Sequence, residues 1–336
     1  MITKFHAENF TAFKELAIDF SPGINIFIGE NGTGKTHVMK ALYSACSIID
    51  TRGERDFVQK LKSVFLPNTI GRLVRRTVGR SSGSIEVFRK DAGDKTERYI
   101  KCRLTTLNKT ECTLRRWNED RRSFVTYIPV KDMLANAPGF RSLYAEKHIH
   151  FEEIYSDIID KALLPASRGK QTPERSNLTK ILSSVISGRV IEKNEQFYLK
   201  NKSGELEFTL LAEGFRKLGL LYLLIRNETL MNGSILFWDE PEANLNPKLA
   251  KTVVKILIEL QKMGVQIFIA THDYVFLKEF DLAISEEDNI LYHSLFYDSE
   301  EEIAHAFFPD FDDLTPNVID DTFDDILDRE IQNKIK

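Results

Sequence analysis

Residues 24–36 read INIFIGENGTGKT, an apolar run followed directly by a glycine-rich loop. The run over 24–28 is predicted to form a buried strand, and the loop fits the phosphate-binding pattern of Gly, any four residues, Gly, Lys, and Thr or Ser. Glycines let the backbone turn its N–H groups toward an anion, and a helix that opens near Lys35 adds the positive end of its dipole. Strand, loop and helix therefore predict a nucleotide-phosphate site in an α/β protein.

Two side chains of this loop have defined chemical roles. Lys35 would bridge the β- and γ-phosphates, and Thr36 would offer its hydroxyl to Mg²⁺. The predicted ATP-binding residues are Gly29, Asn31, Gly32, Thr33, Gly34, Lys35, Thr36 and His37. A β-hairpin within residues 2–28 is predicted to lead into this site, and a helix is predicted from Thr36 to about Ile48.

The composition is typical of a soluble globular protein, with 42% hydrophobic and 29% charged residues among 336. The formal net charge of −4 argues against a chain coated with basic surface for nucleic acid, so any DNA contact must be confined to a patch. Cys46, Cys102 and Cys112 are odd in number and widely spaced, which predicts free thiols in a reducing cytosol. The sequence shows no export signal and no apolar stretch of membrane-spanning length, so a cytoplasmic protein without a membrane partner is expected.

The middle of the chain is predicted to be β-rich and then helical. Residues 84–128 predict a β-meander, with strands over 84–88, 98–104, 112–114 and 124–128. Amphipathic helices are predicted over 151–159 and 178–186, with a polar loop at 167–173 between them. Four arginines precede the meander, namely Arg72, Arg75, Arg76 and Arg80. This arginine strip either contacts phosphate groups or is a solvated face of a strand or helix.

Residues 210–216 read LLAEGFR and stand where a helix is predicted to begin, because apolar residues follow at helical spacing. A helix N-terminus with a glycine at its mouth can bind an anion. The same pattern also fits a plain buried helix.

Residues 235–242 read ILFWDEPE, a buried strand that ends in two adjacent carboxylates. Such a pair is costly to place there without a cation or a reacting group beside it. Asp239 suits the shell of Mg²⁺, including contact through water, and Glu240 suits orienting or deprotonating an attacking water. The alternative is a pair that only caps the end of the strand.

Residues 267–273 read IFIATHD and repeat this plan of an apolar strand that ends in polar residues. His272 is suited to sensing a γ-phosphate by donating a hydrogen bond. A histidine at a strand end is otherwise structural. Its position one strand after Asp239 and Glu240 favours the catalytic role.

These four motifs, in this order, resemble those of the ABC-type ATPases of the SMC, RecF and Rad50 kind, and the opening segment Glu8–Phe13 is similar to theirs. The resemblance covers residues 1–48 and 205–280. It implies an α/β fold, namely an ABC-type P-loop ATPase head with a β-rich arm and an inserted helical subdomain. The implied parts are an ATPase lobe with the phosphate loop and the β-meander at 1–128, the helical subdomain at 129–204, a second lobe at 205–280 and an acidic segment at 281–336.

In that family two heads sandwich ATP, and the signature motif of each head contacts the γ-phosphate bound by the other. The resemblance therefore implies an ATP hydrolase that works as a homodimer, with ATP and Mg²⁺ as cofactors and with Thr36 and Asp239 at the metal. The implied catalytic residues are Glu240, His272 and Lys35, and the implied signature residues, acting on the partner's site, are Ala212, Glu213 and Gly214.

The chain departs from the family pattern at two places. The family usually has Ser where this chain has Ala212, so one hydroxyl contact to the γ-phosphate is missing and slow hydrolysis is expected. The Q-loop of the family should follow the strand at 124–128, but residues 129–132 read PVKD and contain no Gln. The missing Gln also disfavours the nucleotide subunit of a membrane transporter.

Two lengths and one motif separate the subfamilies. The distance of 175 residues from Thr36 to Leu211 is too short for the long coiled coil of SMC or Rad50, and the 64 residues after His272 are too few for the nuclease domain of OLD-family proteins. Residues 239–247, DEPEANLNP, look more like the OLD-related ATPases of anti-phage systems than like RecF. Those ATPases commonly work with a separately encoded effector, often a nuclease, as in Septu-type defence, so control of such an effector is the implied function.

The segment 281–336 holds 17 Asp and Glu against 3 Lys and Arg, with phenylalanines interleaved. It is either a solvated cap on the ATPase or a docking surface for a basic effector protein. The competing function is a RecF-like, DNA-binding ATPase in repair. The DNA strip of such a protein would join residues 72–80 to Arg115, Arg116, Arg121 and Arg122.

Overall fold

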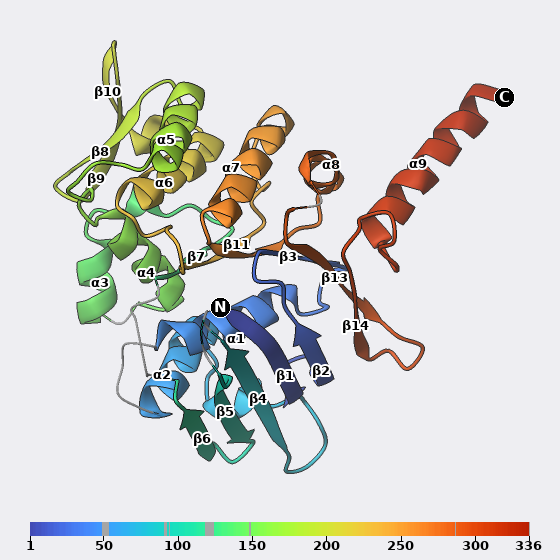
Figure 1. The fold of residues 1–336 in the computed structure, drawn as a ribbon. Coiled ribbons are helices and arrows are strands. Elements are labelled where there is room, and N and C mark those ends of the chain that lie inside the picture. The colour runs from blue at the N-terminus through green and yellow to red at the C-terminus, as the bar shows by residue number, and fades with distance from the viewer. Residues whose placement is uncertain are drawn as a thin grey trace.

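The computed structural model describes residues 1–48, 54–90, 93, 95–117, 124–147, 149–285 and 287–335. A six-stranded sheet with the order β14-β13-β3-β12-β11-β7 lies at its centre; β14 is antiparallel to its neighbour and the other strands are parallel. The strands are β3 (Ile24–Gly29), β7 (Val125–Ile128), β11 (Ile235–Asp239), β12 (Gln266–Ala270), β13 (Ile290–Tyr297) and β14 (Ile303–Phe308). Figure 1 shows this sheet between two layers of other elements.

The side chains of the central strands alternate between two cores, because successive residues of a strand point to opposite faces. Ile24, Ile26 and Ile28 of β3 lie in the core that the sheet forms with one helical layer, whereas Phe27 lies in the core on the other face. The first layer consists of α6 (Glu213–Arg226), α7 (Ala250–Lys262) and α8 (Tyr274–Ala283), and the opposite face is covered by α1 (Lys35–Ser47). The predicted helix after the phosphate loop is therefore confirmed.

A five-stranded antiparallel sheet with the order β2-β1-β4-β5-β6 shares its core with α1. Its strands are β1 (Ile2–Phe10), β2 (Phe13–Asp19), β4 (Ser82–Arg89), β5 (Arg98–Thr105) and β6 (Thr110–Arg115), and α2 (Glu54–Phe65) packs beside α1. The antiparallel pair β1–β2 confirms the hairpin that was predicted ahead of the phosphate loop.

The predicted meander is confirmed for its first three strands and wrong for the fourth. Strands β4, β5 and β6 pair consecutively, but β7 leaves this sheet and pairs in parallel with β11 at the edge of the central sheet. All four side chains of β7 are buried. A strand that is buried on both faces has no apolar–polar alternation, so its sequence pattern does not reveal which sheet it joins.

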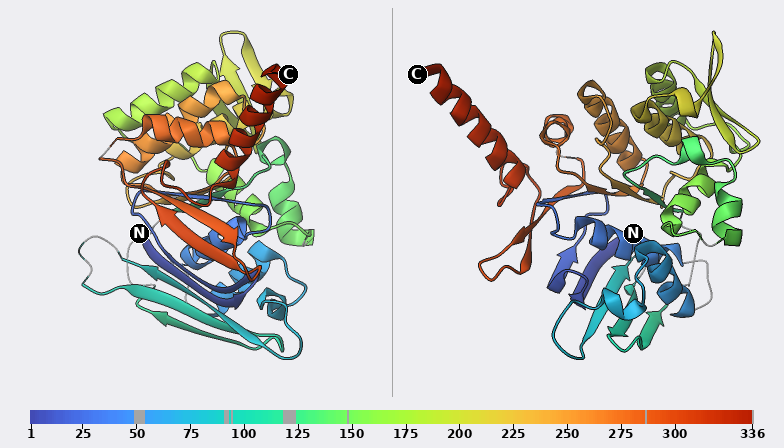
Figure 2. Two further views of the ribbon diagram at one scale, coloured as in Figure 1. Left: turned by 90° about the vertical axis from the view of Figure 1, so that its right-hand side faces the viewer. Right: turned by 180° about the vertical axis from the view of Figure 1, so that it is seen from behind.

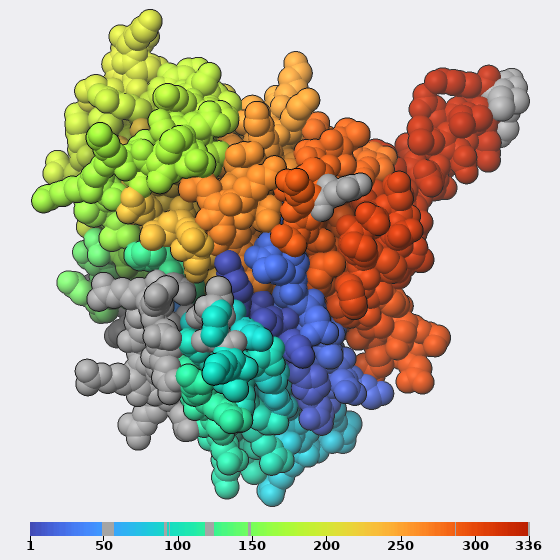
Figure 3. All heavy atoms as spheres, viewed as in Figure 1, coloured from blue at the N-terminus to red at the C-terminus, as the bar shows by residue number. Residues whose placement is uncertain are grey.

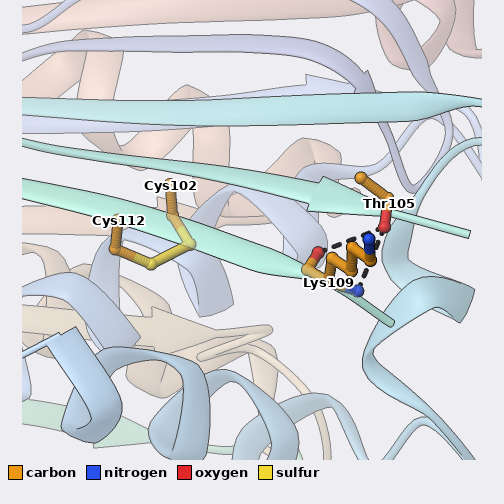
Figure 4. Close-up of a disulfide and its surroundings, with 4 residues drawn as sticks. All are labelled: Cys102, Thr105, Lys109 and Cys112. Atoms are coloured by element: carbon orange, nitrogen blue, oxygen red, sulfur yellow. Dashed lines mark hydrogen bonds between the residues drawn. A yellow bond between two sulfur atoms is a disulfide. The ribbon is translucent and has the colours of Figure 1, made fainter. Parts of the chain in front are cut away.

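The prediction of three free thiols is also wrong, because Cys102 and Cys112 form a disulfide (Figure 4). The two cysteines lie directly opposite each other in the β5–β6 pair, with Cα atoms 4.0 Å apart. The turn between the strands is held by Thr105 and Lys109, since the Thr105 N–H donates to the Lys109 carbonyl at 3.0 Å. Cys46 is buried in α1 and is not part of this bond. Strand register decided the pairing, and spacing in the sequence does not give the register.

Reduction of this disulfide should lower the stability of the native protein by about 3 kcal/mol, because a cross-link that closes a loop of this size removes conformational entropy from the unfolded chain. The measurement is the midpoint of urea unfolding with and without a phosphine reductant. In Cys46→Ala protein the reductant should cause the same shift. An equal midpoint in both buffers would show that the cross-link does not contribute.

The inserted part of the chain contains helices and a small sheet. The helices are α3 (Phe140–Lys147), α4 (Glu153–Ala162) and α5 (Pro173–Val185), so the two amphipathic helices expected here are confirmed. The sheet consists of β8 (Arg189–Lys193), β9 (Gln196–Asn201) and β10 (Gly204–Glu207), which pair in sequence order as antiparallel neighbours. These three short strands are exposed along much of their length and were not predicted.

The last part of the chain adds two strands to the central sheet and then forms a helix that extends away from the body. Strand β13 pairs in parallel with β3, and β14 follows as an antiparallel edge strand; neither strand was predicted. The final helix, α9 (Val318–Ile335), projects from the body, as Figure 1, the right-hand view of Figure 2 and Figure 3 show. Within the described residues no helix is both long enough and apolar enough to cross a membrane.

Candidate functional site

The phosphate loop connects β3 to α1 through backbone conformations that require glycine. Gly29, Gly32 and Gly34 have φ angles of +140°, +90° and +88°. A Cβ on Gly29 would lie 2.0 Å from the carbonyl oxygen of Leu295, and a Cβ on Gly34 would lie 2.4 Å from the ring of Phe13. The loop can therefore take this shape only with glycines at these positions.

Lys35 opens α1 and folds back over the loop. Its Nζ donates hydrogen bonds to the carbonyl oxygens of Gly29 at 2.7 Å and Glu30 at 2.9 Å. Burial lowers the pKa of the Lys35 ammonium, while the nearby carboxylates of Asp239 and Glu240 act in the opposite direction. The ammonium is thus held at the loop, where it can meet a phosphate group.

Thr36 and Asp239 meet across the gap between α1 and the end of β11. The Thr36 hydroxyl donates to Asp239 Oδ2 at 3.1 Å, and the hydroxyl of Tyr127 from β7 donates to the same oxygen at 3.0 Å. Burial raises the pKa of the Asp239 carboxyl, and these two hydrogen bonds lower it. Tyr127 was not predicted as a site residue; only its place in a strand parallel to β11 reveals it.

The donors at this point fit a magnesium ion. Mg²⁺ prefers oxygen ligands and usually binds one or two protein oxygens, with water and substrate phosphate completing its shell. A buried carboxylate 3.1 Å from a hydroxyl supplies such a pair. The described residues contain no group of three His, Cys, Asp or Glu side chains that could hold a metal by themselves. Thr36 and Asp239 would hold the ion, which would supply positive charge beside the phosphates.

Glu240 and His272 lie side by side at the ends of neighbouring strands. Glu240 Oε1 is 3.5 Å from His272 Nδ1, and both side chains are partly exposed. Glu240 has φ +46°, which is unusual for a residue other than glycine, and its N–H donates to the carbonyl of Ala270 at 2.9 Å. The parallel β11–β12 pair therefore brings the carboxylate and the imidazole together, as the sequence predicted.

Two further side chains support this edge of the site, and sequence reasoning did not select them. Glu242 Oε1 accepts a hydrogen bond from the Thr271 hydroxyl at 2.8 Å, next to His272. Lys217 of α6, which is 2% exposed, donates from Nζ to the carbonyl of Ala243 at 2.7 Å and lies 3.3 Å from that of Glu240. The signature helix and the segment after β11 are thereby joined. A lysine inside a helix and a second glutamate give no distinctive sequence signal.

The signature residues lie at the start of α6. Ala212 is the N-cap of this helix and is exposed, but its side chain cannot cap it. Glu213 accepts a hydrogen bond from Asn244 Nδ2 at 3.0 Å, and Gly214 packs against the backbone of the same segment, where a Cβ would lie 2.9 Å from the Asn244 carbonyl. The helix N-terminus remains open at Ala212.

The segment that follows β7 is the one in which the family resemblance predicts a Q-loop glutamine. An ion pair lies there instead. The Asp132 carboxylate, whose side chain is 1% exposed, lies 2.8 Å from Arg216 Nε of α6. The Asp132 N–H also donates to Glu213 at 3.3 Å. Burial raises the pKa of Asp132 and the charge of Arg216 opposes this shift. Asp132 thus connects β7 to the signature helix.

A pocket of about 210 Å³ collects most of the predicted site residues. It is lined by Asn31, Gly32, Gly34, Lys35, Thr36, His37, Asp239, Glu240, Ala270 and His272. Of the other predicted ATP-binding residues, Gly29 shapes the loop and Thr33 is fully buried, with its hydroxyl donating to the Glu30 carbonyl at 2.8 Å. Among the described residues that line this pocket, none comes from Ala212–Gly214 of the same chain.

Tyr127→Phe should weaken the response to Mg²⁺ about tenfold, because groups that hold a metal ligand in place typically matter by that amount. The Tyr127 hydrogen bond lowers the pKa of Asp239, so its loss raises that pKa further and the defect should grow as the pH is lowered. The measurement is Mg²⁺ half-saturation of ATP turnover over a series of pH values. The matched control is Tyr43→Phe, which removes a hydroxyl that bonds Asp157 at 2.5 Å in the same core. An equal effect of both changes would contradict the prediction.

In sequence the chain is similar to proteins named DNA replication and repair protein RecF. The relative from Limosilactobacillus reuteri is 24% identical over 184 residues, which cover 49% of this chain and 47% of the relative. The relative from Lactobacillus gasseri is 48% identical over 42 residues, which cover 12% of this chain and 11% of the relative. The chain thus spans about half the length of the first of these relatives.

In structure the chain is similar to SMC heads. One head, bound to the C-winged helix domain of ScpA, superposes with a TM-score of 0.61 at 14% identity, over 91% of this chain and 97% of that chain. Another, from Pyrococcus furiosus with an extended coiled coil and bound to the C-terminal domain of ScpA, gives a TM-score of 0.56 at 13% identity, over 91% and 96% of the two chains. At this identity the likeness shows the fold alone, and it confirms the predicted P-loop ATPase head.

The family described as "AAA domain, putative AbiEii toxin, Type IV TA system" matches residues 24–278. The match begins at the first residue of β3 and ends within α8, so it contains the phosphate loop, the carboxylate pair and His272. It covers well over half of the chain. The chain therefore belongs to this AAA-domain family, and its fold is similar to that of SMC heads.

Proposed function

We propose that two copies of this chain close around ATP and Mg²⁺, hydrolyse ATP, and use the cycle to control a separately encoded effector protein. One observation carries the dimer: the pocket gathers the phosphate loop, Glu240 and His272 but includes no residue of its own signature segment. That segment lies at an exposed helix N-terminus, which is suited to an anion on a neighbouring molecule. A second copy would supply it.

Mixing two defective proteins tests this arrangement. Lys35→Ala removes the phosphate contact, and Ala212→Glu places a negative charge at the exposed N-cap. Each protein alone should be inactive, but a mixed dimer has one site with an intact Lys35 and an intact Ala212, so ATP turnover should return on mixing. If no activity returns although mixed dimers form, the loop and the signature act within one copy.

Ala212→Ser should raise ATP turnover about two- to tenfold, which corresponds to one net hydrogen bond of about 0.5–1.5 kcal/mol. The serine hydroxyl would reach the phosphate bound by the partner copy, as the family resemblance implies, and it would also cap α6. Ala212→Gly supplies a similar cap without a hydroxyl and so separates the two effects. The measurement is steady-state turnover at saturating ATP. A serine protein no faster than the glycine protein would contradict the proposed contact.

The effector would dock on α9. This helix carries six Asp and Glu against two Lys and Arg, and it exposes Phe323, Ile326, Leu327 and Ile331. It is tied to the body through Phe323, whose ring stacks on Tyr274 with centroids 4.0 Å apart. An apolar stripe on an acidic helix fits a partner groove with an apolar floor and a basic rim. Co-purification with the products of adjacent genes, lost in Ile326→Asp/Ile331→Asp protein, would support this docking site.

The defence role is supported by resemblance and not by the geometry of the site. Residues 239–247 are similar to the OLD-related ATPases of anti-phage systems, including Septu-type systems, and the family description mentions a toxin of a toxin–antitoxin system. Expression with the adjacent genes should protect cells from phage, and Glu240→Gln should remove the protection. Full protection by the Glu240→Gln protein would show that defence does not require ATP hydrolysis. Such a role would place the protein in the cytoplasm.

The second candidate is a RecF-like ATPase that binds DNA, and the names of the sequence relatives favour it. Of the arginines predicted for its DNA strip, Arg72, Arg76 and Arg80 are exposed, whereas Arg75 pairs with Glu302 at 2.6 Å. Arg115 and Arg116 are exposed on and after β6, and Arg121 and Arg122 lie outside the described residues. Salt-dependent binding to duplex DNA that is lost when these arginines are changed would favour this function.

A further inference from the structure

The loop that carries His272 is held by hydrogen bonds on both sides of this residue. The hydroxyl of Thr271 donates to Glu242 Oε1 at 2.8 Å, and the backbone N–H of His272 donates to the same oxygen at 3.3 Å. On the other side, the Asp273 N–H donates to the Thr271 hydroxyl oxygen at 3.2 Å, and Asp273 Oδ1 caps α8 by accepting from the Phe276 N–H at 2.7 Å. Thr271 thus connects the Glu242 carboxylate to the start of α8.

Glu242 is itself anchored to a well-defined backbone. Its carbonyl accepts from the Leu245 N–H at 2.8 Å, and the Ala243 N–H donates to the Glu240 carbonyl at 3.1 Å, so the chain forms turns directly after β11. In addition, the buried ammonium of Lys217 donates to the Ala243 carbonyl at 2.7 Å. These contacts fix the backbone from which the Glu242 side chain extends.

The second oxygen of the Glu242 carboxylate has no hydrogen-bond partner among the described residues, although this Oε2 atom is buried. Burial raises the pKa of the carboxyl, and the hydrogen bonds from Thr271 and from the His272 N–H lower it. A buried oxygen without a partner costs stability, so a group of this kind in a native structure needs a reason other than packing. The hydrogen bonds that the other oxygen accepts supply such a reason.

His272 depends on its backbone for its orientation. Its side chain is about half exposed and lines the phosphate pocket, with Nδ1 3.5 Å from Glu240 Oε1. Apart from this contact, the imidazole has no hydrogen-bond or ion-pair partner in the part of the chain that the structure describes. The direction in which the ring points is therefore set by the backbone that Glu242 holds.

We propose that Glu242 is a positioning residue, which fixes the backbone at Thr271 and His272 so that the imidazole points at the bound γ-phosphate. This inference rests on the proposed function, because it assigns His272 a part in ATP hydrolysis. Glu242 is not a second base, since it is not among the described residues that line the pocket and a base must reach the attacking water. A purely structural carboxylate would matter equally whether or not His272 is present.

The first test compares steady-state ATP turnover in variants of the full chain. Glu242→Leu removes both acceptor oxygens and should lower kcat about ten- to hundredfold at an unchanged KM for ATP, because a small displacement of a catalytic group costs that much. Glu242→Gln keeps an acceptor for the Thr271 hydroxyl and should retain most of the native rate, whereas loss of a general base would slow both variants equally. Thr271→Val should resemble Glu242→Leu, and Thr271→Ser should resemble the native chain.

The same substitution in His272→Ala protein separates positioning from a general effect on the fold. Glu242→Leu should cause no further loss there, because a residue that acts only through His272 has no imidazole left to orient. Glu279→Leu on α8 makes the same chemical change outside the pocket and should leave turnover unchanged. The proposal is overturned if Glu242→Leu costs as much in the His272→Ala protein as in the native chain, or if Glu242→Gln is as slow as Glu242→Leu.

A second measurement needs no hydrolysis, so a failure of the proposed ATPase is not mistaken for a failure of this proposal. In nucleotide-free Glu242→Leu protein, the His272 amide loses its acceptor and its hydrogen exchange should become about two- to tenfold faster. The Glu240 amide, which donates to the Ala270 carbonyl at 2.9 Å, is the internal reference and should exchange at its native rate. Unchanged exchange at His272 would overturn the proposal, whether or not the native chain hydrolyses ATP.

Discussion

Glu240→Gln protein should bind ATP like the native chain but hydrolyse it about 10²–10⁴ times more slowly, the range typical for the loss of a general base. The carboxylate lines the pocket beside Lys35 and lies 3.5 Å from His272 Nδ1. Glutamine keeps the size and the polar contacts of this side chain but cannot accept a proton. Because closure precedes hydrolysis in the proposed cycle, the variant should also accumulate as a dimer with ATP.

Two measurements together check this result: steady-state phosphate release and the mass of the protein in solution with ATP. Glu279→Gln on α8 provides a carboxylate-to-amide control outside the pocket and should behave like the native chain. Native rates of hydrolysis in the Glu240→Gln protein would remove Glu240 from its role as base. In that case the next residue to examine would be Glu242, which bonds Thr271.

Lys35→Ala should abolish detectable nucleotide binding. The Lys35 ammonium is hydrogen-bonded to two loop carbonyls, and Lys35 is the one lysine or arginine among the described residues that line the pocket. Loss of a charge-assisted contact to phosphate costs about 1.5–3 kcal/mol, and loss of the loop geometry that this side chain holds adds to that cost. Both losses weaken the binding of ATP in the ground state as well as the stabilisation of the transition state.

Titration calorimetry with ATP and Mg²⁺ measures this effect, and the urea midpoint shows whether the protein still folds. Lys251→Ala, on the exposed side of α7, removes an equal charge away from the loop and should bind ATP normally. Native affinity in the Lys35→Ala protein would mean that the loop does not bind phosphate, and the proposed ATPase would then be untenable.

Much of the site could be predicted because its main residues stand at the ends of apolar strands. The runs that became β3, β11 and β12 are buried, and parallel strands place their carboxyl ends at one edge of the sheet. Lys35, Glu240 and His272 therefore meet in one pocket although they are far apart in the sequence. Phosphate binding, hydrolysis and the contribution of a partner's Ala212–Gly214 remain predictions.

The parts that were missed depend on neighbours in space. Tyr127 reaches Asp239 only because β7 joins the central sheet, and the sequence of β7 does not indicate that choice. Cys102 and Cys112 pair because the register of β5 and β6 places them opposite each other. Lys217 is a buried cation whose partners are backbone carbonyls. Because any residue type supplies a carbonyl, no sequence motif indicates this contact. Each of these features requires the tertiary arrangement to be known.

The position of β3 between β12 and β13 has a consequence for how the protein is made. The phosphate loop is translated long before the two strands that flank β3, because β12 begins only at Gln266 and β13 only at Ile290. Until then the apolar side chains of β3 lack their sheet partners, and the carbonyl of Leu295 that packs against Gly29 does not yet exist. A nascent chain stalled before residue 290 should therefore be a chaperone client that cannot bind nucleotide.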